Sequence, residues 1–349
     1  MEAKKTYYPH LDGLRALAIC WVVLHHMPVH FPPWFAAVVN RGDLGVEVFF
    51  AISGFVVVQS LLSSPGLPQF YLKRIFRIVP AFWVTLAAIW GLSFFDQKLA
   101  AKLGSIKNLW ASFPLFFYNY VSEETTGTIP GVLNVFWSLC FEEQFYVFLG
   151  ITALVLRGKF REVLPVLVIG FVVLRNVLCQ LGLVADLTAL QFQTHLRLDA
   201  ILVGSLAYLH RDTLKTWVAK VGTWPFFILF LVLALAHREV GVKGQALIYS
   251  LMPLVIVGLM GSLEENAKMN AVLSSKVLSL LGVCSYEIYL THEIVLGGLV
   301  RLGLQGQPVL YLCAGLVVSS VIGIFFHRWF SAPLNQALRA KFIKVRASL

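Results

Sequence analysis

Long apolar stretches recur from one end of the 349-residue chain to the other, and they restrict its fold more than any other feature. A helix needs about 20 mostly apolar residues to cross the roughly 30 Å hydrocarbon layer of a membrane. Hydrophobic residues make up 58% of the sequence and charged residues 13%, against about 45–50% and about 25% in soluble domains. The sequence therefore predicts an all-α, polytopic integral membrane protein.

Apolar runs bounded by charge, proline or glycine predict about ten transmembrane helices. Their expected positions are residues 11–30, 44–63, 76–95, 133–156, 162–181, 194–209, 222–237, 245–262, 277–300 and 308–328. The Phe-rich piece at 110–120 is open to two interpretations, an interfacial or re-entrant helix or a further span. No repeat or second soluble domain is evident. One membrane-embedded domain is expected over 1–349, with its core at about 8–335 and a basic cytoplasmic tail at 336–349.

The net charge of +10 could indicate nucleic-acid binding or membrane topology, and the positions of the cationic residues distinguish the two. Lysine and arginine gather between apolar runs, without a nucleic-acid motif, so nucleic acid is not an expected partner. The clusters are Lys73/Arg74/Arg77, Arg157/Lys159/Arg161, Arg211/Lys215/Lys220, Lys268/Lys276 and the tail Arg339–Arg346. A cytoplasmic N-terminus places nearly all of them on one side, as the positive-inside rule requires. We expect both termini in the cytoplasm, the chain in the inner (plasma) membrane, and 96–132 as the longest outer loop.

The five cysteines give no sign of a disulfide framework or a metal site. Each lies within an apolar stretch, and none has a Cys-x-x-Cys neighbour. Neither disulfides nor a bound metal are therefore expected.

Ionisable side chains nevertheless stand inside the predicted spans. One such charge at the bilayer centre costs about 2.5–3.5 kcal/mol, so each is a functional hypothesis by default. They are Arg15, His25, His26, Glu47, Glu142, Glu143, His195, Arg197, Asp199, Glu287, His292 and Glu293. Counting about 1.5 Å per residue from the expected cytoplasmic ends places His26, Glu142, Glu143, His195 and His292 at one depth. Four helices are thus predicted to converge on one layer.

Arg15 and His26 are eleven residues apart, which places them on one helical face about 16 Å from each other. Moving an acyl group to a hydroxyl needs a base or a nucleophilic carrier, and histidine can be either. The phosphates of a cytoplasmic acyl-CoA donor would bind Arg15 and the cluster Lys73/Arg74/Arg77 at the inner mouth. The pattern indicates a membrane-embedded acyltransferase with His26 as general base or acyl carrier.

At these residues the sequence resembles the bacterial integral-membrane acyltransferase family three, which O-acylates surface saccharides and some antibiotics. Six segments carry the resemblance in order: HLDGLRALAICWVVLHH (10–26), GVEVFFAISGFVV (45–57), FYLKRIFRIVP (70–80), FWSLCFEEQFYVF (136–148), HLRLDAILVGSLA (195–207) and CSYEIYLTHEIV (284–295). It extends over about residues 8 to 335, nearly the whole chain. Each segment alone is a weak signal, but the ordered set is specific.

The resemblance implies a ten-helix core that takes an acetyl group from cytoplasmic acetyl-CoA and delivers it across the membrane. The family's Arg, ten residues, His pattern falls on Arg15 and His26, and its Arg-x-x-Arg pattern on Arg74 and Arg77. Candidate catalytic residues are His26, Glu143 and His292. Candidate donor-binding residues are Arg15, Lys73, Arg74 and Arg77, and candidate substrate-binding residues are Glu142, Arg197, Asp199 and Tyr289. Two departures are Glu293-Ile294, where relatives often have Trp-Pro, and the expected lack of an appended hydrolase-like domain.

Structural roles stay open for many of these side chains. The cluster Lys73/Arg74/Arg77 could act only as a topology signal, and Glu142 and Glu143 could pair with Arg15 or Arg197 to hold helices together. Further candidates for a purely structural role are Asp12, Arg197 and Asp199 in ion pairs, His292 and Tyr289 in helix contacts, His25 in packing, and Ser53 in a small-residue patch.

The acceptor is also open. A saccharide or glycolipid is the first expectation, and a small lipophilic molecule such as a macrolide is the second. A proton-coupled transporter is the alternative from another class, since it too would use intramembrane histidine, glutamate and arginine. The bilayer and acyl-CoA are the expected partners, and assembly as a homo-oligomer is left open.

Overall fold

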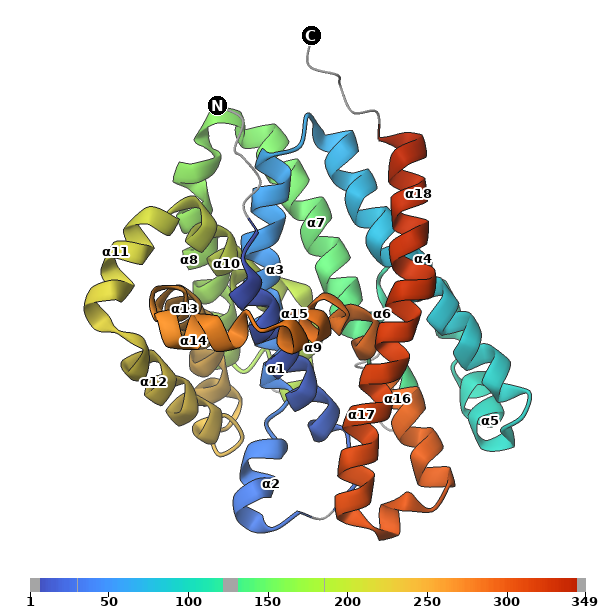
Figure 1. Ribbon diagram of the computed structural model, residues 1–349. Helices are drawn as coiled ribbons and strands as arrows, with labels where there is room; N and C mark the ends of the chain where they lie inside the picture. Colours follow the sequence, from blue (N-terminus) through green and yellow to red (C-terminus); the bar gives the residue numbers. More distant parts are fainter. Residues whose placement is uncertain (1–6, 30, 122–130, 185, 344–349) are drawn as a thin grey trace.

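The computed structural model describes residues 7–29, 31–121, 131–184 and 186–343, and over these ranges it holds helices and no β-strand. The expected all-α class is therefore confirmed (Figure 1). Residues 122–130 of the predicted outer loop and 344–349 of the predicted tail lie outside these ranges.

The helices follow the predicted spans closely. In the first half they are α1 (Pro9–His25), α2 (Pro33–Val39), α3 (Leu44–Leu62), α4 (Leu67–Ser93), α5 (Gln97–Ser105), α6 (Tyr118–Val121), α7 (Phe136–Leu156) and α8 (Phe160–Gln180). In the second half they are α9 (Leu187–Phe192), α10 (Leu198–Leu209), α11 (Arg211–Val221), α12 (Thr223–Ala236), α13 (Val242–Glu265), α14 (Ala267–Leu273), α15 (Lys276–Val283), α16 (Ser285–Arg301), α17 (Pro308–Phe326) and α18 (Ala332–Phe342). A π-helical turn, His327–Ser331, joins α17 to α18.

Six helical segments in the described part of the chain are long and apolar enough to cross a membrane. They are Pro33–Leu62, Leu67–Ser93, Gly131–Leu156, Phe160–Gln180, Val242–Glu265 and Pro308–Phe342. The pair α11 and α12 passes the same test together but bends by 91°. The chain is therefore a multi-pass membrane protein, while the count of ten spans and their orientation stay predictions.

The helix limits differ from the predicted spans at three places. α1 ends at His25 because Pro28 disfavours helical backbone just before it. The predicted span 277–300 is two helices that meet at Cys284, and α15 lies across α1 (Figure 1). The cluster Lys73/Arg74/Arg77, expected in a loop, forms the early turns of α4.

The centre of the molecule is the close crossing of α3 and α10. A Cβ atom on Gly54 would lie 1.9 Å from the carbonyl oxygen of Ile201, and one on Gly204 would lie 2.0 Å from that of Ala51. Only glycine allows the two backbones to approach so closely, and small residues serve this purpose in membrane helices generally. The crossing fixes α3 so that Ser53, next to Gly54, faces a cavity rather than the helix contact.

Candidate active site

A polar cavity of about 610 Å³ opens beside the early turns of α4 and the helix α18. Five cationic side chains line it, and we call it the cationic cavity: Arg15, Lys73, Arg74, Arg77 and Arg339. Only two carboxylates, Asp12 and Glu287, line it with them in the described part of the chain. The four residues predicted to bind the donor thus lie together, with a fifth cation that was expected in a tail.

Both carboxylates of the cationic cavity already have partners. Asp12 accepts from Arg15 Nη1 at 3.3 Å and from the hydroxyl of Tyr7 at 2.7 Å. Burial and the Asp12 carboxylate raise the pKa of Tyr7 to about 12, so its hydroxyl stays a neutral donor. Glu287 Oε1 lies 3.1 Å from Nδ1 of His327. The remaining cations therefore leave the cavity strongly positive.

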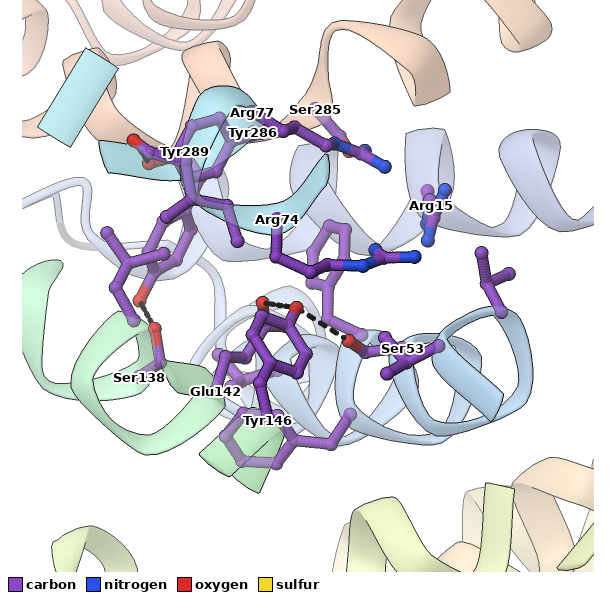
Figure 2. A pocket seen from close by; sticks show the side chains of 17 residues that line it. Arg15, Ser53, Arg74, Arg77, Ser138, Glu142, Tyr146, Ser285, Tyr286 and Tyr289 are labelled. Carbon is purple, nitrogen blue, oxygen red and sulfur yellow. Dashed lines mark hydrogen bonds between the residues drawn. The ribbon is translucent and has the colours of Figure 1, made fainter. Parts of the chain in front are cut away.

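A narrower pocket of about 80 Å³ continues from the cationic cavity, and Figure 2 shows the side chains that line it. Arg15, Arg74 and Arg77 border both spaces. Opposite them, Tyr146 donates to Glu142 Oε2 at 2.9 Å, and its hydroxyl lies 3.4 Å from Ser53 Oγ. At the far end Ser138 donates to the hydroxyl of Tyr289 at 2.8 Å.

The two predicted histidines meet in what we call the histidine layer, which consists of His26, His292 and Glu293. The rings of His26 and His292 are 5.0 Å apart. Nδ1 of His26 donates to Val22 O at 2.9 Å, and Nδ1 of His292 donates to Tyr289 O at 2.6 Å. Because a carbonyl only accepts, these bonds hold the proton on Nδ1 and leave both Nε2 atoms with free lone pairs.

A single face of α16 connects the narrow pocket to the histidine layer. Tyr286 and Tyr289 line the pocket, and Tyr289 contacts His292 at 5.6 Å between ring centroids. Since residues three and four apart share a helical face, the same stripe continues to His292 and Glu293. The rise from Tyr286 to His292 is about 9 Å. Tyr289 thus stands between the space lined by arginine and the histidines.

Glu293 is the third member of the histidine layer. Its Oε1 lies 3.5 Å from Nε2 of His26, the atom that carries the lone pair. One ligand atom from each of His26, His292 and Glu293 lies within 4.8 Å of the others, a donor set that could hold a transition metal. The same atoms can also act as a histidine and acid pair, which needs no ion.

The two glutamates on α7 have different surroundings. Glu142 faces the narrow pocket near the arginines, as described above. Oε1 of Glu143 is buried without a hydrogen-bond partner in the described residues, and Glu143 lines neither of these two spaces. The geometry thus brings Glu142, rather than Glu143, to the arginine side of the site.

Three residues from the predicted layer and its surroundings lie in other contacts. His195 stacks on Tyr120, with Nδ1 3.1 Å from the hydroxyl of Tyr120. Arg197 forms a buried ion pair with Glu47. Asp199 accepts two bonds from the buried Arg175, at 2.6 and 2.8 Å. These contacts supply the structural role that the sequence left open for Arg197 and Asp199.

Sequence reasoning missed three residues that matter to this arrangement. Glu293 was noted as an intramembrane charge and as a departure from a motif but was given no role, although it directly follows a candidate histidine in the sequence. Arg339 was assigned to a tail, and Arg175 was overlooked inside the run 162–181. A charge within an apolar run was the available signal for Arg175, whereas nothing local indicated that Arg339 contacts α4.

Comparison with known proteins gives matches over nearly the whole chain. The family model described as an acyltransferase domain matches residues 8–328. The O-acetyltransferase OatA of Staphylococcus aureus is 26% identical over 95% of this chain and 57% of its own length. The Bacillus subtilis protein named "Putative peptidoglycan O-acetyltransferase YrhL" is 24% identical over 94% of this chain and 55% of its own length. No solved structure matches significantly.

The chain spans somewhat more than half the length of these relatives, and what it shares with them is the membrane part described above. The matched region includes the segments around Arg15, His26, Arg74, Arg77 and His292. The chain belongs to the acyltransferase domain family.

Proposed function

We propose that the chain is a membrane O-acetyltransferase that moves an acetyl group from cytoplasmic acetyl-CoA to a hydroxyl of a cell-envelope saccharide. The observation that carries the proposal is the continuous face of α16, which leads from the cationic cavity past Tyr289 to the paired histidines. A polyanionic donor suits one end of this path and proton transfer suits the other.

In this proposal the cations hold the phosphates while the thioester extends through the narrow pocket toward the histidine layer. Nε2 of His26 takes the proton of the acceptor hydroxyl as its oxygen attacks the thioester carbon. Coenzyme A leaves as the thiolate and takes up a proton. Glu293 lies where its carboxylate stabilises the imidazolium, and the 3.5 Å separation would shorten once Nε2 carries the proton.

The alternative chemistry makes His26 an acyl carrier. Nε2 would attack the thioester carbon and expel coenzyme A as the thiolate. The acceptor hydroxyl would then attack the acetyl-imidazole, release free His26, and give its proton to the departing Nε2 or to the thiolate. Rapid quenching of the protein with labelled acetyl-CoA, without acceptor, separates the two mechanisms because only a carrier retains label on His26.

The topology is part of the proposal. We propose ten spans with both termini in the cytoplasm of a cell whose inner (plasma) membrane holds the chain, all in one domain. The cationic cavity then faces the cytoplasm, where acetyl-CoA is present. Accessibility labelling of single cysteines introduced at Ser64 and Lys98 checks this, since the two positions should react from opposite sides.

The acceptor is proposed from the names of the relatives, one of which specifies peptidoglycan. An amino-sugar glycan of the cell wall is therefore the first acceptor to test, and a macrolide-like molecule is the second. Substrate flux through proteoliposomes without acetyl transfer would favour a transporter instead.

The test compares His26→Ala with His25→Ala in purified protein given labelled acetyl-CoA and glycan fragments. The two histidines are adjacent in the chain, but Nδ1 of His25 donates to Val39 O at 3.2 Å, and this bond connects α1 to α2. We expect His26→Ala to lose about 100-fold or more of the transfer rate and His25→Ala only a few-fold. Unchanged transfer in His26→Ala, or equal losses in both, would contradict the mechanism.

A further inference from the structure

Helix α18 lies beyond residue 328, where the family match ends, yet it forms one wall of the cationic cavity. Its residues Asn335, Gln336 and Arg339 line the cavity opposite α1 and α3. Arg339 Nη2 donates to the carbonyl oxygen of Lys73 at 3.1 Å, which fixes α18 against the early turns of α4 (Figure 1). The guanidinium of Arg339 is thereby added to those of Arg74 and Arg77.

The charges around Arg339 are not balanced. In the described part of the chain, no carboxylate oxygen lies within 4 Å of the guanidinium groups of Arg74, Arg77 and Arg339. The two acids of the cavity are held by Arg15 and His327. Five cations therefore face two engaged carboxylates in the cavity, and Glu142 in the adjoining narrow pocket adds one more negative charge. Because clustered cations are costly without enough counter-charge, and Arg74 is buried, this arrangement favours an anionic ligand.

Single polar atoms at the cavity wall point to the same conclusion. Nε of Arg74 and Nε of Arg339 are buried and have no hydrogen-bond partner, and Arg74 is only 8% exposed. Oδ1 of Asn335 is likewise buried and unpartnered. Two donors and one acceptor are thus left unsatisfied across a gap between α4 and α18. A ligand that carries both phosphate oxygens and N–H or O–H groups satisfies all three.

We infer that α18 supplies a phosphate subsite for the nucleotide part of the donor, in which Arg339 binds a phosphate group and Asn335 accepts from the base or ribose. The inference rests on the proposed function for the identity of the donor, but not on the acetyl-transfer chemistry. It makes Arg339 a donor-binding residue that acts on affinity and leaves the histidine layer untouched.

The experiment measures binding of unacylated coenzyme A, which cannot react, to the full chain in nanodiscs of zwitterionic lipid. Arg339→Gln is compared with Lys341→Gln, which removes the same charge from the exposed side of α18. We expect Arg339→Gln to weaken binding about tenfold or more and Lys341→Gln less than twofold, with Arg339→Lys between them. Thermal unfolding of each variant checks that α18 stays docked.

Two further arms identify the ligand group. 3′-Dephospho-coenzyme A shows which phosphate Arg339 binds: an unchanged loss on Arg339→Gln assigns the pyrophosphate, and a vanished loss assigns the 3′-phosphate. Anionic lipid in the nanodisc tests a headgroup as the source. Equal coenzyme A affinity in wild type and Arg339→Gln, equal losses in both glutamine variants, or a loss seen only with anionic lipid would overturn the inference. Normal binding without acetyl transfer would sink the proposed function alone.

Discussion

Two groups of arginines in this protein, one fully buried and one lining an open cavity, have opposite surroundings. Arg175 and Arg197, beside α10, are each paired with a carboxylate: Arg175 bonds to both oxygens of Asp199 and to Ser250 Oγ, and Arg197 pairs with Glu47 and stacks 3.6 Å over the ring of Tyr249. The group Arg74, Arg77 and Arg339 lines an open cavity and contacts no carboxylate among the described residues.

This difference separates intramembrane charges that hold helices together from those that are available to a ligand. A buried charge that is fully paired holds helices in register, because removing its partner leaves an uncompensated ion. A buried charge that faces a cavity without a partner is arranged for something that binds there. Both groups look alike in the sequence, since each is arginine inside or next to an apolar run. Substitutions in the paired group should therefore lower stability, whereas substitutions in the cavity group should weaken donor binding.

The largest effect is expected from Asp199→Ala. It leaves the fully buried Arg175 without its carboxylate, which costs about 3–5 kcal/mol and lowers the ratio of folded to unfolded protein by a factor of hundreds to thousands. Size-exclusion profiles and thermal unfolding in detergent measure this. Asp212→Ala is the control, because Asp212 is exposed and its ion pair with Arg211 is long, at 3.9 Å. A stable Asp199→Ala that lost acceptor affinity would move the pair from structure to substrate binding.

The second effect concerns the cavity group. Arg74→Gln should raise the KM for acetyl-CoA about 10–100-fold while thermal stability stays the same or rises, because the change relieves repulsion from Arg77 and removes no ion pair. Steady-state kinetics with matched unfolding curves measure both quantities. Arg211→Gln, on the exposed surface of α11, is the control. A fall in kcat at constant KM would contradict donor binding by Arg74.

The sequence predicted the helix positions and the local motifs of the site well. Apolar runs located the helices, and the motifs around Arg15, Arg74 and Arg77 identified residues that do gather in space. Motifs of this kind are local, so they survive without knowledge of the packing. The depth estimate assigned His26 and His292 to one layer, and the rings of these two residues are 5.0 Å apart.

The contacts between residues that are distant in the chain could not be predicted, because they depend on how the helices pack. The depth estimate included His195, but depth says nothing about rotation around the helix, and His195 instead stacks on Tyr120. The break at Cys284 was hidden because no proline marks it within the predicted span 277–300. Arg339 resembled a tail residue because its neighbours in space lie on α4, more than 260 positions earlier in the chain. Whether a buried charge is structural depends on whether it forms an ion pair, and the residues of such a pair are distant in the sequence.

The smallest effect should come from Glu293, the carboxylate of the histidine layer, because in the proposed mechanism it stabilises His26 only while that histidine is protonated. Glu293→Gln keeps the shape of the side chain but removes its charge, so it should destabilise the imidazolium of His26 by about 1 kcal/mol. We expect kcat to fall roughly fivefold while the KM for acetyl-CoA is unchanged, as Glu293 lies away from the cationic cavity. Stopped assays over a range of acetyl-CoA concentrations measure both.

The same variant distinguishes an acid pair from a metal centre, because the three side chains of the histidine layer could hold an ion. If the pair explains the site, strong chelators leave wild-type activity unchanged, and purified wild type and Glu293→Gln contain equally little transition metal. Stoichiometric metal in the wild type that is lost in Glu293→Gln would replace the acid role of Glu293 with ligation. His26 would then hold the ion through Nε2 and could not use that lone pair as a base.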